Sequence, residues 1–270
     1  MITIIFAPPR TGKTCLLTHL LNEACFDRSR TKQMRKEIEL KNSSGFCLTA
    51  PLHTVSANYD ITFKKFGYSP RHNRFINPFR LGYDNEFVKT HFSMPYECIG
   101  ITEAQKYLNS HWALYFPDWQ SRFYEQHGHN NLDIYLDTQR PMLINANVRE
   151  LAKFIEVLNL DIRYDRNGRI CKMIWTVRRI DNSSIFDRYM STGKSDHSLY
   201  SNDVIVADYN VFELYNSQSC KPKFYQGHFD SDFDYIKSEA PEESVDGYIE
   251  WLEKYDDELP QGYFQKRTVK

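Results

Sequence analysis

The first fourteen residues place the strongest constraint on how this chain can fold. An apolar, β-branched run spans residues 2–6, which is the composition of a strand buried in a sheet. Residues 7–14 then read Ala-Pro-Pro-Arg-Thr-Gly-Lys-Thr, and leucines follow at helical spacing. A strand, a tight loop with Gly-Lys-Thr and a helix are the context of a phosphate-binding loop. The start of the chain therefore predicts a nucleotide site rather than a chance strand–helix turn.

Each part of this loop has an expected role in holding a nucleotide. Backbone N–H groups of the loop and of the helix N-terminus would cradle phosphate oxygens. Lys13 would reach the β- and γ-phosphates, and the Thr14 hydroxyl would bind Mg²⁺. The expected ligands are therefore ATP and Mg²⁺. The predicted nucleotide-binding residues are Pro9, Arg10, Thr11, Gly12, Lys13, Thr14 and Cys15.

One position departs from the usual pattern of the loop, because Ala7 stands where the first glycine belongs. That glycine eases the turn off the strand, and alanine can replace it only if φ stays negative there. Pro8 and Pro9 fix their own φ and would stiffen the loop, which is the expected compensation.

A second apolar strand, over residues 98–101, ends in residues that suit ATP hydrolysis. Glu103 sits where a general base would orient the attacking water. Thr102 sits where P-loop ATPases have an aspartate that supports Mg²⁺, and threonine supplies no charge. Its hydroxyl could support the metal only through a bound water. The sequence thus predicts an ATPase with weakened metal support.

A third strand, over residues 132–136, leads into the sequence Asp137-Thr138-Gln139. Polar side chains at the carboxyl end of a neighbouring core strand are well placed to sense a γ-phosphate or to hold the lytic water. Thr138 and Gln139 are therefore candidate catalytic residues. We expect the side chains of Thr14, Glu103 and Thr138 to converge on one pocket.

The rest of the chain is less regular. Residues 52–95 read as a long insertion, and residues 46–50 as a strand. An amphipathic helix is expected over 148–158, followed by a β-hairpin with strands at 160–164 and 170–177. Residues 180–203 are rich in Ser, Asn and Asp and read as loop.

Two domains are expected on this pattern, an ATPase domain over residues 1–180 and a loop-rich C-terminal extension over 181–270. The extension has an acidic tail, with twelve acidic residues against two lysines between positions 230 and 258. The remainder is mildly basic. Basic residues gather at 28–41 and, among aromatics, at 71–80, where solvated surface and contact with nucleic acid are the open alternatives.

Composition argues against several other classes of protein. The six cysteines form no C-x-x-C pair, so neither a zinc site nor a disulfide framework is expected, and a reducing cytosol fits. No signal peptide and no membrane-spanning segment are expected, because a basic leader and a run of about 18 apolar residues are both missing. His127 and His129 have no third ligand nearby, so we expect them to pack beside the nucleotide site rather than to bind metal.

Taken in order, these motifs resemble the zonula occludens toxin (Zot-like) family, the assembly ATPases of filamentous phages. The resemblance covers roughly residues 1–180. It rests on the N-terminal phosphate-binding loop, Glu103-Ala104-Gln105 after an apolar strand, His127-Gly128-His129-Asn130-Asn131-Leu132-Asp133-Ile134, Thr138-Gln139-Arg140-Pro141 and Asn147-Val148-Arg149-Glu150-Leu151.

The resemblance implies an α/β fold of the additional-strand P-loop NTPase class, RecA- and FtsK-like, with a mostly parallel central sheet flanked by helices. It implies an ATPase that extrudes or packages single-stranded phage DNA, or a DNA–protein complex, as a homo-oligomeric ring in virion morphogenesis. The expected location is the host cytoplasm or the periphery of the inner membrane. Inner-membrane members of the family have a membrane-spanning segment, which is expected here to be either missing or supplied by a separate assembly protein.

Ring motors complete their sites with an arginine from the neighbouring subunit. Arg149, at the position of the family's matching arginine, is the first candidate, and Arg140 and Arg122 are alternatives. A solvated surface arginine is the other interpretation of Arg149.

Two other classes of function remain open on the sequence. The first is a nucleotide-binding assembly switch with little or no ATP turnover, which the missing carboxylate at Thr102 favours. Lys13, Thr14 and Glu103 favour the motor. A small-molecule kinase fits less well, because Glu103 followed by Thr138-Gln139 suits activation of water.

Overall fold

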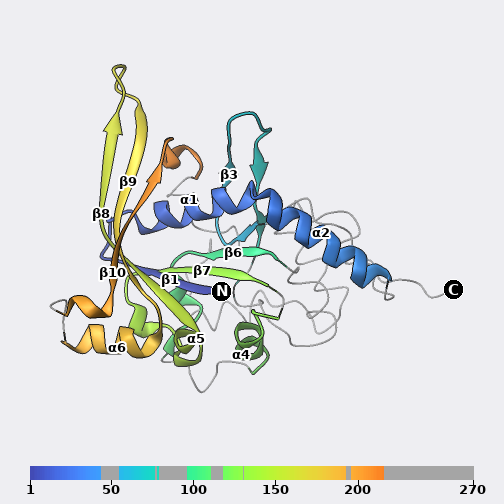
Figure 1. Ribbon diagram of the computed structural model, residues 1–270, viewed down its shortest axis with the longest axis vertical. Coiled ribbons are helices and arrows are strands. Elements are labelled where there is room, and N and C mark those ends of the chain that lie inside the picture. The colour runs from blue at the N-terminus through green and yellow to red at the C-terminus, as the bar shows by residue number, and fades with distance from the viewer. Residues whose placement is uncertain are drawn as a thin grey trace, which may run out of the picture.

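The computed structural model describes residues 1–43, 55–76, 78, 96–110, 118–129, 131–192 and 196–215. Its centre is an eight-stranded sheet in the order β10-β9-β8-β1-β7-β6-β2-β5 (Figure 1). The strands are β1 (Ile2–Phe6), β2 (Val55–Ala57), β5 (Arg74–Phe75), β6 (Cys98–Ile101), β7 (Asp133–Thr138), β8 (Ala152–Tyr164), β9 (Ile170–Ile180) and β10 (Ser201–Ala207). A separate pair joins β3 (Thr62–Phe63) to β4 (Arg71–His72).

Helices flank this sheet on both faces. The α-helices described are α1 (Lys13–Cys25), α2 (Arg28–Ser43), α4 (Asp118–Glu125), α5 (Ala146–Glu150) and α6 (Ser183–Thr192). Short 3₁₀ helices are η2 (Ala104–Lys106), η4 (Pro141–Leu143), η5 (His197–Leu199) and η6 (Val211–Glu213). Within the described ranges, no helix is long and apolar enough to cross a membrane.

The strand that leads into the phosphate-binding loop lies at the middle of the sheet. β1 is buried along its whole length and is parallel to β7 on one side and β8 on the other. β7 separates β1 from β6, so the three strands predicted to be neighbours are neighbours. A strand inserted between the loop strand and β6 is the additional-strand arrangement, and the predicted fold class is confirmed.

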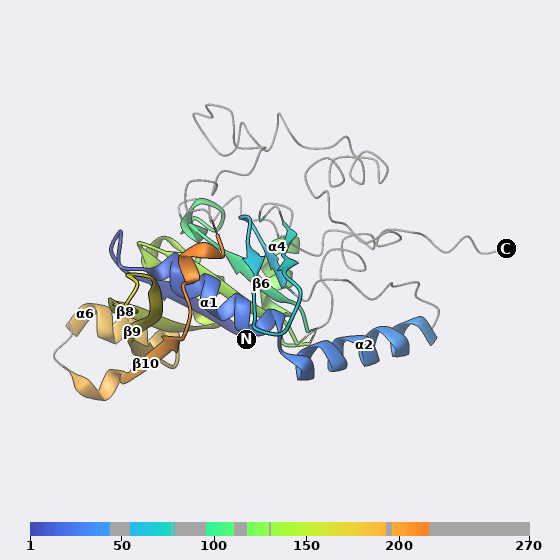
Figure 2. The ribbon, with the colours of Figure 1, turned by 90° about the horizontal axis from the view of Figure 1, so that it is seen from above.

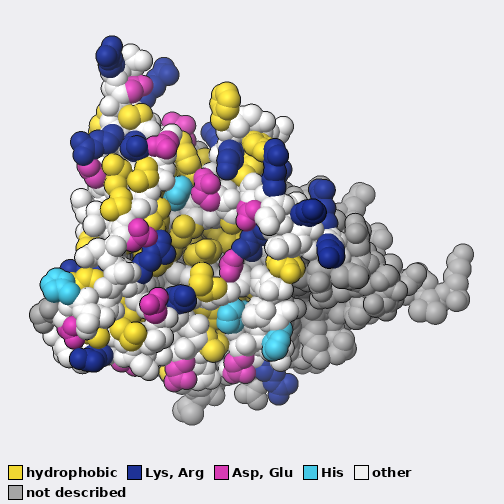
Figure 3. Space-filling view, viewed as in Figure 1, with side chains coloured by type: hydrophobic (Ala, Val, Ile, Leu, Met, Phe, Trp, Pro, Cys, Tyr) yellow, Lys and Arg dark blue, Asp and Glu magenta, His cyan; other side chains and the backbone are white. Residues whose placement is uncertain are grey.

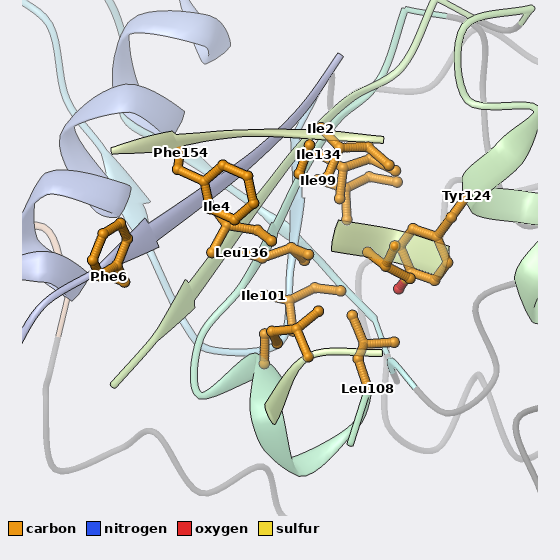
Figure 4. Close-up of a cluster of buried hydrophobic side chains, with 14 of the residues drawn as sticks. Ile2, Ile4, Phe6, Ile99, Ile101, Leu108, Tyr124, Ile134, Leu136 and Phe154 are labelled. Atoms are coloured by element: carbon orange, nitrogen blue, oxygen red, sulfur yellow. The ribbon is translucent and has the colours of Figure 1, made fainter. Parts of the chain in front are cut away.

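Alternation along β1 sends its side chains into two separate cores. Ile2, Ile4 and Phe6 face the side covered by α4, α5 and α6, together with residues of β6 and β7 (Figure 4). Ile5 faces the opposite side, where it packs with the buried face of α1 and with the hairpin of β8 and β9. Figure 2 shows α1 over this second face and α2 continuing outward beyond the sheet.

The helix predicted over 148–158 is wrong. Only α5, which ends at Glu150, is helical, and β8 begins at Ala152. Leu151 and Leu158, whose spacing suggested the helix, are 39% and 36% exposed. The strand between them is buried on both faces, because Phe154 joins one core and Ile155 the other. A strand buried on both faces does not alternate between apolar and polar residues. The apolar residues of this segment therefore matched the spacing of a helix.

The predicted hairpin is present and is longer than expected. β8 and β9 pair antiparallel around a turn at Gly168, whose φ is 73°. The paired strands extend well above α1 (Figure 1).

The loop predicted over 180–203 is also wrong, because it contains α6 and the start of β10. Its polar residues cap the helix, since the Asn182 side chain accepts a hydrogen bond from the Ile185 N–H at 2.9 Å. Phe186 and Tyr189 then pack into the core. β10 pairs with β9 in the main sheet, so the sheet continues past residue 180, while the domain boundary proposed there stays a prediction.

The insertion predicted at 52–95 contributes β2 and β5 to the main sheet. The strand predicted at 46–50 lies outside the described residues. The acidic tail also lies outside them, because the described residues end at 215.

Candidate nucleotide-binding site

The loop between β1 and α1 has the backbone that a phosphate-binding loop needs. Gly12 is the N-cap of α1, with φ 84° and ψ 20°, a left-handed conformation that favours glycine. Ala7 is buried and is not among the described residues with positive φ. Alanine can therefore stand at the position where the loop pattern has its first glycine. Thr11 closes the loop by donating a hydrogen bond from Oγ1 to the Pro8 carbonyl at 2.8 Å.

The β8–β9 hairpin braces this loop from the side. The Trp175 indole N–H donates to the Gly12 carbonyl at 3.2 Å, and the Trp175 ring stacks on His19 with centroids 5.4 Å apart. A Cβ placed on Gly12 would lie 2.7 Å from Cδ2 of Leu160. Gly12 is therefore required both by its φ and by the close approach of the hairpin. The sequence offered no signal for this contact, because residues 12 and 175 are far apart in the chain.

Lys13, Thr14 and Cys15 form the first turn of α1 at the carboxyl end of β1. Lys13 is only 6% exposed, so its ammonium group is held in the fold rather than in bulk water. Cys15 is buried, and that burial raises the pKa of its thiol to about 12. Cys15 is therefore a neutral packing residue beneath the loop.

Asp137, at the end of β7, connects the loop to the end of β6. Its side chain is fully buried. Oδ2 accepts a hydrogen bond from Thr102 Oγ1 at 3.0 Å, and Oδ1 accepts one from the Glu103 N–H at 2.9 Å. Burial raises the pKa of the Asp137 carboxyl, while hydrogen bonds from the Glu103 N–H and the Thr14 side chain and the charge of Lys13 act in the opposite direction. Asp137 is thus a buried carboxylate that faces the loop.

Asp137 is the residue of this candidate site that the sequence did not single out. The sequence placed Thr138 and Gln139 at this strand end and assigned Asp137 no role. The signal that could have found it lies in the register of the sheet, where Ile101 pairs with Leu136. The next position on each strand is then Thr102 beside Asp137, but that register is a tertiary property.

Two amide side chains hold the Glu103 carboxylate. Gln139 Nε2 donates to Oε1 at 3.3 Å, and Gln105 Nε2 donates to Oε2. Glu103 itself has φ 52°, a left-handed conformation that is uncommon for a residue with a side chain. The turn after β6 thus presents Glu103 at the same sheet edge as Asp137.

The remaining predicted site residues lie less centrally. Thr138 is buried, and its Oγ1 accepts a hydrogen bond from the Arg140 N–H at 3.1 Å. Arg149 Nη1 donates to the carbonyls of Met142 at 3.0 Å and Ile144 at 3.4 Å. These contacts hold Arg149 against its own segment, and its role toward a neighbouring subunit stays a prediction. The alternatives Arg122 and Arg140 are exposed.

His127 does not pack beside the nucleotide site, contrary to expectation. Its backbone carbonyl accepts a hydrogen bond from the Leu132 N–H at 3.0 Å, before the first residue of β7. That end of β7 is opposite to Asp137. The two-residue spacing of His127 and His129 thus belongs to the turn that enters β7.

The donor set at the carboxyl ends of β1, β6 and β7 fits a nucleotide with Mg²⁺. The Thr14 hydroxyl and the Asp137 carboxylate are the hard oxygen donors that Mg²⁺ prefers. Lys13 supplies a positive charge for phosphate, and the N-terminus of α1 supplies free N–H groups.

Comparisons with known proteins give likenesses in structure. No family model and no curated protein sequence matches this chain. Among solved structures, it is similar to the N-terminal domain of zonular occludens toxin from Neisseria meningitidis, with 16% identity and a TM-score of 0.47, over 80% of this chain and 98% of that one.

It is also similar to the genome packaging NTPase B204 from Sulfolobus turreted icosahedral virus 2 in complex with ATP-gammaS. The identity is 11% and the TM-score 0.36, over 68% of this chain and 93% of that one. For B204, the DNA-packaging ATPase from Sulfolobus turreted icosahedral virus, the identity is 14% and the TM-score 0.33, with the same coverage of both chains.

Proposed function

We propose that this chain binds Mg²⁺-ATP at the carboxyl ends of β1, β6 and β7 and hydrolyses it. The observation that supports this most is the contact set of Asp137, which brings the phosphate-binding loop and the Glu103 turn to one point. Bound Mg²⁺ would supply positive charge to the β- and γ-phosphate oxygens.

In this proposal the carboxylate that supports the metal comes from β7 and not from β6. Thr14 would bind Mg²⁺ directly, and Asp137, within hydrogen-bonding reach of the Thr14 side chain, would hold the metal or its water. Thr102 lacks a charge and donates its hydroxyl proton to Asp137. Its proposed role is therefore to orient the carboxylate, which replaces the water-mediated role expected from the sequence.

Glu103 is the proposed general base. Hydrogen bonds from Gln139 and Gln105 fix its two carboxylate oxygens. A water held between Glu103 and the γ-phosphate would lose its proton to the carboxylate as its oxygen bonds to the γ-phosphorus. The bond from that phosphorus to the β–γ bridging oxygen would break, and ADP would leave. Gln139 thereby acts as a positioning residue for the base.

The work coupled to hydrolysis is proposed from the resemblance to the Zot-like family, namely extrusion or packaging of single-stranded phage DNA by a homo-oligomeric ring. A separate membrane-anchoring protein would hold the ring at the inner membrane of the host. The alternative is an assembly switch in which ATP is bound and turned over little.

ATP turnover by the purified protein, with and without single-stranded DNA, separates these two functions. The motor requires phosphate release that single-stranded DNA accelerates. ATP binding without turnover, both with and without single-stranded DNA, would support the assembly switch and contradict the motor.

A further inference from the structure

A basic cleft lies between α2 and the loop that joins β3 to β4, at the far end of α1 from the phosphate-binding loop. The thirteen residues of α1 separate the two places by about 20 Å. The cleft has a volume of about 590 Å³ and is lined by Phe26, Arg28, Thr31, Lys32, Arg35, Lys36, Tyr68 and Arg71. Five of these residues are cationic and none is acidic. Figure 3 shows Lys and Arg side chains gathered over this part of the molecule.

Aromatic contacts build the wall of the cleft. The Arg71 guanidinium lies 5.0 Å from the centroid of the Phe26 ring, and its Nη1 donates to the Cys25 carbonyl at 3.0 Å. The Arg28 guanidinium lies 5.6 Å from the centroid of the Tyr68 ring and hydrogen-bonds its hydroxyl. These contacts join two stretches that are separate in the sequence, the basic residues at 28–36 and Arg71.

α2 is anchored to the body of the protein at its first turn. Arg30 forms an ion pair with Asp133 and donates to the Tyr96 carbonyl at 2.7 Å. Asp27 accepts a hydrogen bond from the Ser29 N–H at 2.8 Å, so this acidic residue is engaged as a helix cap. The first turn of α2, from which the cations of the cleft continue, is therefore held against the rest of the protein.

Three cations of α2, Lys32, Arg35 and Lys36, have no acidic partner among the side chains that the structure describes. All three are exposed. The neighbouring Glu23 pairs with Lys65 at 3.6 Å. Like charges three and four residues apart on a helix repel one another, and an anionic ligand bound between them would relieve that repulsion.

The β3–β4 loop carries two exposed aromatic side chains, of which Tyr68 lines the cleft and Phe66 lines an adjoining pocket that shares Tyr68 with it. Phe66 is at the tip of the β3–β4 loop, next to Gly67 with φ 79°, and its relative exposure is 102%. Tyr68, on the cleft wall, is 37% exposed. Such aromatic rings beside a cationic groove are the combination that binds single-stranded nucleic acid, because cations contact phosphates while rings stack on unpaired bases.

We propose that this cleft binds single-stranded nucleic acid, with the cations of α2 and Arg71 on phosphates and with Phe66 and Tyr68 on bases. The cleft itself is independent of the ATP site, but the choice of a nucleic acid substrate for a motor rests on the proposed function. A duplex offers phosphates without free base faces, so the aromatic residues predict a preference for single strands.

The test measures binding of fluorescent oligothymidine by anisotropy, without ATP, over a range of salt concentrations. The triple variant Lys32→Glu/Arg35→Glu/Lys36→Glu should bind at least about tenfold more weakly and with a shallower salt dependence. The matched control is Arg163→Glu/Arg166→Glu/Arg169→Glu, which makes the same change of charge on exposed residues of the β8–β9 hairpin. It should bind like the wild type. Equal loss in both triple variants, or loss in neither, would overturn the proposal.

Phe66→Ala tests base stacking separately from charge. It should weaken oligothymidine binding about fivefold or more and leave binding of a duplex unchanged. An equal loss for both ligands, or competition by polyglutamate as strong as that by oligothymidine, would overturn the proposal in favour of a general polyanion surface. ATP binding is measured on each variant. A wild-type protein that binds ATP but not oligothymidine refutes the cleft alone, whereas one that does not bind ATP refutes the proposed function.

Discussion

Thr102 donates a hydrogen bond to Asp137 across the ends of two neighbouring strands, with 3.0 Å between Oγ1 and Oδ2. The position that resembles the metal-supporting aspartate of P-loop ATPases thus holds the donor, and the adjacent strand holds the carboxylate. The two strands are parallel and in register, so exchanging the residue types would move the charge by one strand. In the proposed function, this pair moves the carboxylate that supports the metal from β6 to β7.

An exchange of these residues tests the relocation. Asp137→Asn should weaken ATP binding in Mg²⁺ about tenfold or more, and have much less effect in EDTA. Thr102→Asp should also weaken binding, because it sets a second carboxylate against Asp137. The double variant Thr102→Asp/Asp137→Thr should recover part of the Mg²⁺ dependence. Calorimetric titration with and without Mg²⁺ measures this, and a Mg²⁺ effect unchanged in Asp137→Asn would contradict it.

The contact between the hairpin and the phosphate-binding loop predicts that Gly12 tolerates no side chain. Gly12→Ala should lower the free energy of unfolding by about 1–2 kcal/mol for its positive φ and by about 1–3 kcal/mol more for the clash with Leu160. Gly168→Ala is the matched control, because Gly168 has φ 73° and nothing within 4 Å of the added Cβ. Urea unfolding of both variants separates strain from packing. Equal losses of stability would show that the hairpin does not press on the loop.

Local patterns predicted what depends on short stretches of chain. β1, its loop and α1 follow from residues 2–25 alone, and the predicted hairpin turn follows from Asn167-Gly168. The start of β8 was misread because burial on both faces removes the alternation of a strand. The role of Asp137 was missed because its partner Thr102 is brought beside it only by the register of β6 and β7. Both the start of β8 and the position of Asp137 beside Thr102 depend on contacts between segments that are distant in the sequence.

Arg149 gives a prediction about subunit assembly. Its hydrogen bonds to Met142 and Ile144 predict that Arg149→Ala lowers the free energy of unfolding by about 1 kcal/mol. If Arg149 also reaches a neighbouring site, the variant keeps monomer ATP binding and loses turnover in the assembled protein. Mixing it with Lys13→Ala protein should then restore part of the turnover. A wild-type protein that is an active monomer at every concentration would contradict the role in assembly.

His19 gives a prediction about pH. Burial lowers the pKa of His19 below its usual 6.5 in the folded protein. The unfolded chain therefore binds more protons once the pH falls below about 6.5, so stability should decrease between that pH and the folded pKa. His19→Phe keeps a ring against Trp175 but cannot titrate, and its melting temperature should fall less over this range. The same decrease in the variant would assign the effect to other groups, such as His127, whose pKa burial also lowers.

The most direct test of the nucleotide site is titration of a fluorescent ATP analogue, with Mg²⁺, into four proteins. Lys13→Ala should bind about tenfold to a hundredfold more weakly than the wild type, because it removes the charge that faces the terminal phosphates. Lys153→Ala, which removes an exposed lysine on β8, should bind like the wild type. Glu103→Gln should also bind like the wild type, since it keeps the shape of the proposed base. Wild-type affinity in Lys13→Ala, or equal losses in Lys13→Ala and Glu103→Gln, would contradict the account.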